Sequence, residues 1–258
     1  MAEEYTYRDS HKALDKGEVY DGNYERIPWR RFLWSREQKI LLSILEKYFE
    51  GRDTHLLDFA CGTGRITGLL EDRVKTSTAV DVSPSMLAVA RTKLKRTEII
   101  EADITTDNVL KGRKFNLITA FRFFVNAEPS LRSQAMTTLA GLLSEDGLLV
   151  FNNHHNLGSP WIKVANWRHR QKDPDGIFNV MGIKQMNELV EAVGLEIKEL
   201  YPIGFFHPPK IPVSYFFNIA VDAVAGRFQC LKRLSESPIA VCTRRRSHTI
   251  SGQPKGGT

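Results

Sequence analysis

The sequence predicts an α/β fold with a doubly wound, mostly parallel sheet of seven strands, helices on both faces and an antiparallel last strand. Short apolar runs alternate with stretches of helical periodicity along most of the chain. Repeated strand-then-helix order favours a parallel sheet covered on both faces. A chain of 258 residues with 42% hydrophobic residues can bury the core of one large domain.

The apolar patterns place the individual elements. Strands are expected at 55–59, 77–82, 98–101, 116–121, 148–152, 196–201 and 239–243. Apolar residues recur at helical spacing from Ile40 to Tyr48, which predicts a helix that ends near Gly51. Further helices are expected at 65–71, 85–95, 129–143 and 183–193.

Three segments flank or interrupt this pattern. Residues 1–36 are rich in aromatic and charged side chains, and we expect an N-terminal lid or cap. The main domain is expected to span 37–243, with a helical insertion at about 205–234. Residues 244–258 are basic and polar, which is typical of a disordered tail.

Composition narrows the function classes. The net charge is +6, much of the excess lies near the C-terminus, and internal charges of both signs are interleaved, so nucleic acid is an unlikely partner. The three cysteines form no CxxC pair, and neither a disulfide framework nor a metal site is expected. The start lacks a signal-peptide pattern and no stretch approaches the ~20 apolar residues of a membrane span, so we expect a cytoplasmic protein without membrane contact.

The strongest motif is the glycine turn after the first strand. The apolar run 56–59 leads into Gly62 and Gly64, which let the backbone approach a nucleotide-like ligand closely. Gly68 extends the pattern to a spacing that some dinucleotide-binding reductases use. Against that alternative stand Asp58 just before the turn and the lack of a Tyr-x-x-x-Lys pair.

Two acidic residues follow the next two strands. Asp81 ends the second strand, where a carboxylate can accept hydrogen bonds from both hydroxyls of a ribose. Asp103 follows the third strand, where a carboxyl group can bind an exocyclic amine while Ile104 packs on a purine.

Together these elements resemble the class I S-adenosylmethionine-dependent methyltransferases over about residues 56–151. The resemblance implies a Rossmann-like fold, S-adenosylmethionine as cofactor and S-adenosylhomocysteine as product. It places Asp58, Gly62 and Gly64 at the methionine moiety, Asp81 at the ribose, Met86 near the adenosine, and Asp103 with Ile104 at the adenine. The expected cofactor-binding set is completed by Ala60, Val82 and Phe121.

The chain departs from that family at Ala60, where glycine is usual. Alanine has the smallest side chain with a Cβ, so a close approach survives if its φ is negative. We therefore expect cofactor binding to persist.

The acceptor is less well defined. Residues 120–126 lack the Asp/Asn-Pro-Pro-aromatic motif of exocyclic-amine nucleic-acid methyltransferases, and no Pro-Cys nucleophile is present. His154 and His155 follow the fifth strand, where an imidazole suits a general base, although packing and turn capping would also explain them. Arg122, Asn126, Tyr24 and Trp161 are the expected substrate-binding residues.

These observations predict a methyltransferase that acts on a polar small molecule. The leading hypothesis is O-methylation of a hydroxyl, as in a sugar or glycan, with His154 or His155 as general base. The alternatives are an N-methyltransferase acting on an amine or a protein side chain, and a cofactor-binding protein without catalysis. The sequence leaves the acceptor and the oligomeric state open.

Overall fold

A computed structural model describes residues 22, 24, 26–173, 179–207 and 214–245. These residues form a seven-stranded sheet with the order β3-β2-β1-β4-β5-β7-β6. The strands are β1 (His55–Phe59), β2 (Thr76–Asp81), β3 (Thr97–Glu101), β4 (Phe115–Ala120), β5 (Leu143–Asn152), β6 (Leu195–Tyr201) and β7 (Ile239–Arg244). Strands β1 to β5 pair in parallel, whereas β7 is antiparallel to both β5 and β6. The predicted fold class is confirmed.

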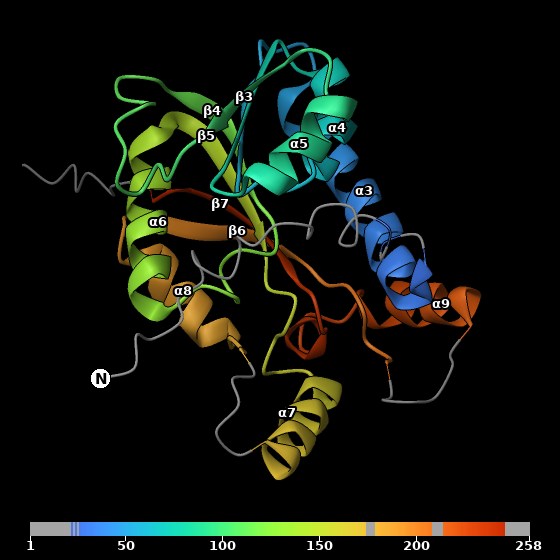
Figure 1. The fold of residues 1–258 in the computed structure, drawn as a ribbon. Coiled ribbons are helices and arrows are strands. Elements are labelled where there is room, and N and C mark those ends of the chain that lie inside the picture. The colour runs from blue at the N-terminus through green and yellow to red at the C-terminus, as the bar shows by residue number, and fades with distance from the viewer. Residues whose placement is uncertain (1–21, 23, 25, 174–178, 208–213, 246–258) are drawn as a thin grey trace, which may run out of the picture.

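Helices cover both faces of this sheet (Figure 1). The described helices are α3 (Pro28–Phe49), α4 (Arg65–Leu70), α5 (Pro84–Lys93), α6 (Pro129–Leu142), α7 (Pro160–Lys172), α8 (Ile183–Glu191) and α9 (Tyr215–Ala225). Two short 3₁₀ segments, η1 (Glu71–Arg73) and η2 (Lys232–Leu234), complete the described elements. Proline occupies the first residue of α3, α5, α6 and α7, where its missing N–H has no helical partner to lose.

The core lies in two layers, one on each side of the sheet. Neighbouring residues of a strand point to opposite faces, so Leu57 joins the layer under α6 and α8 while Leu56 joins the layer under α3. Phe32 and Ile44 of α3 are almost fully buried in the second layer. Helix α3 is therefore an integral part of the domain.

Some bounds differ from the expectations. Helix α3 begins at Pro28 rather than near Ile40, because Phe32 and Leu33 extend its buried stripe toward the N-terminus. The expected boundary between residues 36 and 37 thus falls inside a helix. Strand β5 begins at Leu143, where it already pairs with Phe115 of β4, rather than at Leu148.

Several expectations concern residues outside the described part. Residues 1–21 of the expected lid, 208–213 of the insertion and 246–258 of the tail belong to this group. The described part of the insertion contains α9 and η2. Among the described helices, none combines the length and the apolar character needed to cross a membrane.

Candidate active site

The turn after β1 has a left-handed backbone at alternate residues. The φ angles are +53° at Ala60, +56° at Gly62 and +74° at Gly64. A Cβ on Gly64 would lie 2.9 Å from Cδ1 of Leu94, whereas one on Gly62 would meet no atom within 4 Å. The condition of a negative φ at Ala60 is therefore not met, because the turn keeps the conformation that glycine adopts freely. The methyl group of Ala60 lines the cleft described below.

Asp58 lies behind this turn and is 1% exposed. Its carboxylate accepts hydrogen bonds from the backbone N–H and hydroxyl of Thr67 in α4, at 3.2 and 2.5 Å, and from the hydroxyl of Thr119 in β4 at 2.8 Å. Burial raises the pKa of Asp58 to about 6, although these hydrogen bonds act in the opposite direction. The side chain joins β1, α4 and β4, and its predicted contact with the cofactor stays a prediction.

Asp81 ends β2 and faces the same turn. Its Oδ2 accepts a hydrogen bond from the N–H of Gly62 at 2.8 Å, and its Oδ1 accepts one from the N–H of Ser83 at 2.9 Å. The turn and the strand end are thereby fixed relative to each other.

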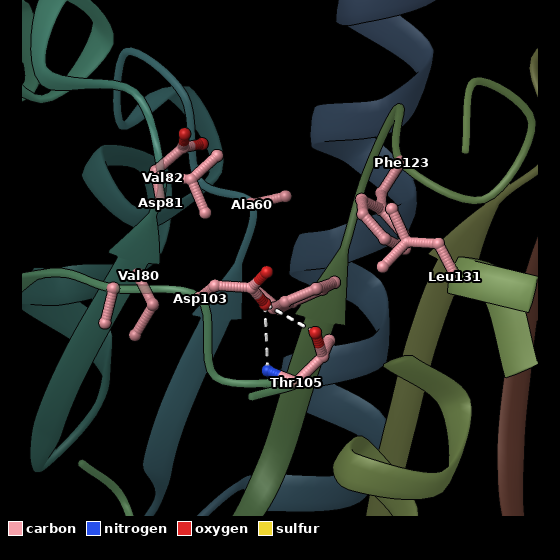
Figure 2. Close-up of a pocket in the computed structure, with 10 residues that line it drawn as sticks. Ala60, Val80, Asp81, Val82, Asp103, Thr105, Phe123 and Leu131 are labelled. Atoms are coloured by element: carbon pink, nitrogen blue, oxygen red, sulfur yellow. Dashed lines mark hydrogen bonds between the residues drawn. The ribbon is translucent and has the colours of Figure 1, made fainter. Parts of the chain in front are cut away.

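A cleft opens at the carboxyl ends of β1, β2 and β4 (Figure 2). In the view of Figure 2, Asp81 and Val82 lie on one side and Phe123 with Leu131 on the other, with Ala60 and Asp103 between them. Asp103 accepts hydrogen bonds from the N–H and the hydroxyl of Thr105 at 3.0 and 2.5 Å. The lining residues are Phe59, Ala60, Val80, Asp81, Val82, Ala102, Asp103, Thr105, Phe123 and Leu131.

The lining of the cleft matches the chemistry of the cofactor that the sequence resemblance implies. Two carboxylates stand among apolar side chains, which matches a ligand with a hydroxylated ribose and a planar base. The open space in front of Gly62 lets backbone approach the rest of the ligand. Asp81 would hold the ribose and Asp103 the amine of the adenine.

The expected cofactor residues divide into two groups. Ala60, Asp81, Val82 and Asp103 line the cleft. Met86 and Ile104 are buried, with 5% and 4% exposure, and do not line it. Phe121 packs in the core layer under α3, and Phe123 occupies the cleft wall instead.

A second cavity of about 500 Å³ lies on the other side of the loop that follows β4. Arg122 lines this cavity while its neighbour Phe123 lines the cleft, so the two spaces meet at one loop. All six residues predicted for catalysis and substrate binding line it: Tyr24, Arg122, Asn126, His154, His155 and Trp161. Sequence reasoning missed Trp29, Arg30, Leu33, Ile162, Ala165, His207 and Glu236.

Glu37 of α3 is fully buried beside this cavity. Its carboxylate accepts hydrogen bonds from Arg65 at 3.0 Å, from Arg122 at 3.2 Å and from the amide of Asn152 at 3.2 Å. The guanidinium of Arg65 also lies over the ring of Tyr24, 4.1 Å from its centroid. This network joins α3, the start of α4, and the ends of β4 and β5.

The two adjacent histidines have different surroundings. Nδ1 of His155 lies 3.0 Å from the carbonyl oxygen of Asn179, which can only accept, so Nδ1 carries the proton and Nε2 has the lone pair. Burial lowers the pKa of His155. His154 is 7% exposed, its Nδ1 has no hydrogen-bond partner among the described residues, and burial lowers its pKa well below the usual value. Both side chains are neutral imidazoles at neutral pH.

Glu236 and His207 form a pair on the cavity wall. Oε2 of Glu236 lies 3.2 Å from Nδ1 of His207, and its Oε1 accepts a hydrogen bond from the indole of Trp29 at 2.9 Å. The His207 ring stacks on Trp29, with centroids 3.9 Å apart. The wall therefore joins residues that are 207 positions apart in the sequence.

Known proteins resemble this chain in sequence, and others resemble it in fold. Residues 56–147 match the family model described as a methyltransferase domain. A methyltransferase of Geobacillus sp. strain WCH70 is 32% identical over 121 residues, which are 45% of this chain and 49% of the relative. Trans-aconitate 2-methyltransferase of Shigella flexneri is 26% identical over 161 residues, 59% of this chain and 60% of that protein. The chain thus spans about half to three fifths of the length of these curated relatives.

Solved structures match over most of the chain. A S-adenosylmethionine-dependent methyltransferase of Thermotoga maritima has a TM-score of 0.64 at 14% identity, covering 88% of this chain and 95% of its own. The N-methyltransferase NodS of Bradyrhizobium japonicum, solved with S-adenosylhomocysteine, has a TM-score of 0.58 at 16% identity, covering 93% and 97%. Residues 56–147 thus resemble a methyltransferase domain, and the fold is that of S-adenosylmethionine-dependent methyltransferases.

Proposed function

We propose that the protein transfers a methyl group from S-adenosylmethionine to a hydroxyl of a polar small molecule, such as a sugar or glycan, with His155 as general base. The observation that carries this proposal is the cavity of about 500 Å³ at the loop after β4, which collects all six predicted catalytic and substrate residues. Its walls combine aromatic rings with polar and charged groups, as expected of a site for a polar ring compound. The relative named for trans-aconitate also supports a small-molecule acceptor.

The reaction needs alignment and one proton acceptor. The cofactor supplies a methyl group on a positively charged sulfur that is displaced in line. Arg122 and Asn126 on the loop between the two spaces would orient the acceptor toward that methyl group. Bound S-adenosylmethionine would give its methyl group to the acceptor oxygen and leave as S-adenosylhomocysteine, and Nε2 of His155 would take the hydroxyl proton.

His155 is better placed for this role than His154. The carbonyl of Asn179 fixes its tautomer, so Nε2 carries the lone pair and the ring cannot flip without losing that bond. Burial lowers the pKa of His155, which favours the neutral imidazole that a general base needs. His154 is more deeply buried, and its ring lies beside that of His155, with centroids 4.7 Å apart.

The first experiment is calorimetric titration with S-adenosylmethionine, S-adenosylhomocysteine and NADPH. We expect the first two to bind, and Asp81→Ala to abolish that binding because the ribose loses its acceptor. Binding of NADPH alone would contradict the assignment.

The second experiment tests the base, with labelled S-adenosylmethionine and a panel of hydroxylated acceptors. We expect His155→Gln to lower kcat by about 10²–10⁴-fold, the usual contribution of a general base. Binding of S-adenosylhomocysteine should stay unchanged, which shows that the variant is folded. The acid limb of the wild-type kcat profile should lie below pH ~6.5, because the pKa of His155 is lowered. An amine acceptor whose methylation survives His155→Gln would favour N-methylation instead.

A further inference from the structure

Two helices begin at the cavity of about 500 Å³ that is lined by Arg122 and His155, which we call the acceptor cavity. Trp29 and Arg30 are the second and third residues of α3, and Trp161 and Ile162 are the second and third of α7; all four line the cavity. Neither helix has an acidic residue in its first turn or a side-chain hydrogen bond at its N-cap. Because a helix N-terminus carries about half a positive charge, both ends add positive potential to the same space.

Two arginines add full charges. Arg30 is half-buried on the cavity wall, with its guanidinium 5.7 Å from the centroid of the Tyr24 ring. Among the described residues Arg30 has no carboxylate at ion-pairing distance. Arg122 also lines the cavity, with its guanidinium 5.8 Å from the centroid of the same Tyr24 ring, and is bonded to Glu37, which lies outside the lining.

One carboxylate, that of Glu236, is present in the described lining of this cavity. Both of its oxygens are already used, one by the indole of Trp29 and one by His207. Its charge offsets one of the two arginines, Arg30 and Arg122, in the lining. The lining as described carries a net positive charge.

The neighbouring histidines respond to this charge. The pKa of His154 is lowered first by burial and then by the charges of Arg122 and Arg30. Its Nδ1 is buried and has no hydrogen-bond partner among the described residues. A cavity with unbalanced positive charge and an unused polar atom in its wall is suited to a ligand that brings negative charge.

We propose that the methyl acceptor carries an anionic group, a carboxylate or a phosphate, in addition to the hydroxyl that is methylated. The anionic group binds between Arg30, Arg122 and the N-termini of α3 and α7, while the hydroxyl faces the loop at Arg122 and Phe123. Sugar acids and sugar phosphates have this chemistry. The inference rests on the proposed function only in using the same cavity, since the binding of an anion requires no methyl transfer.

The test compares matched probes by calorimetry, with and without S-adenosylhomocysteine. Glucuronate, glucose 6-phosphate and inorganic phosphate carry the anionic group, and glucose is their neutral counterpart. We expect at least one of the two sugar anions to bind about 10-fold or more tightly than glucose, since hydrogen bonds to a charged group exceed those to a neutral one by that order. The stronger of the two distinguishes a carboxylate site from a phosphate site. The preference should weaken as salt is added.

Two matched variants locate the site. Arg30→Met keeps an unbranched apolar stem that reaches to about the position of Nε and removes the charge. We expect it to weaken binding of the preferred anion about 10-fold without changing the binding of S-adenosylhomocysteine. Arg31→Met, an exposed neighbour on the same helix, should leave both unchanged. The inference is overturned if all three anions bind no more tightly than glucose, or if Arg30→Met and Arg31→Met behave alike. Loss of S-adenosylhomocysteine binding with the anion preference intact would instead contradict the proposed function alone.

Discussion

The proposed cofactor cleft, lined by Asp81 and Asp103, and the proposed acceptor cavity, lined by Arg122 and His155, are built in different ways. The cleft consists mainly of short loops that follow successive parallel strands, and its two acids stand at 81 and 103 in the sequence. The acceptor cavity combines the start of α3, the start of α7 and the segments around His207 and Glu236. The first is specified by a local pattern, and the second by packing between distant parts of the chain. A search for the substrate must therefore rest on the second region, where sequence motifs are weakest.

The largest effect is expected from a substitution that removes the ionic connection between the two regions. Glu37→Gln removes the charge that Arg65, the first residue of α4, and Arg122 of the acceptor cavity share. Removing one partner of a buried ion pair costs about 3–5 kcal/mol in the free energy of unfolding, because the remaining charges lose their compensation. Urea denaturation of the two proteins measures this difference.

Glu46→Gln is the matched control, since Glu46 is exposed on the same helix. We expect its effect to stay within about 0.5 kcal/mol, as for most surface substitutions. Equal unfolding midpoints for Glu37→Gln and Glu46→Gln would show that the network does not stabilise the fold.

The same contrast decides how much could be predicted from sequence. Strand β1 has the predicted bounds, and β3 and β4 differ from theirs by one residue, because each is a short apolar run ended by a turn. The spacing of Glu37 indicates that it is buried, because it lies four residues from both Leu33 and Leu41 in the buried stripe of α3. No local sequence pattern indicates the positions of His207 and Glu236 on the cavity wall, because these positions depend on packing against Trp29.

The next prediction concerns the cofactor side alone. The folded-state pKa of Asp58 is about 6, whereas an unperturbed aspartate has a pKa near ~3.9. An acid with a raised pKa in the folded state stabilises the fold when protonated. Its contribution is therefore fully present below about pH 4 and is lost as the pH rises through about 6. The loss is about 1–3 kcal/mol, from about two pKa units at 1.36 kcal/mol each at most.

Asp58→Asn isolates this contribution. An asparagine keeps the shape and can still accept from Thr67 while its amide donates to the hydroxyl of Thr119. Other carboxyl groups titrate in both proteins, so the measured quantity is the difference in unfolding free energy between Asp58→Asn and the wild type, by urea denaturation at several pH values. We expect the wild type to lose stability relative to the variant between about pH 4 and 6. A difference that does not change with pH would exclude a raised pKa at Asp58.

The smallest effect on stability is expected from removing one methyl group of the cleft, that of Ala60. Ala60 has a φ of +53°, and a left-handed conformation costs an L-residue about 1–2 kcal/mol. Glycine relieves that strain but gains conformational freedom in the unfolded chain, so Ala60→Gly should stabilise the protein by about 0.5–1 kcal/mol. Ala88→Gly in α5, an exposed helical position, should destabilise it by a similar amount. Thermal unfolding of the two variants compares the same chemical change in two backbone conformations. If both destabilise the protein equally, Ala60 is not strained, and the glycine usual at this position in the family serves ligand approach rather than backbone conformation.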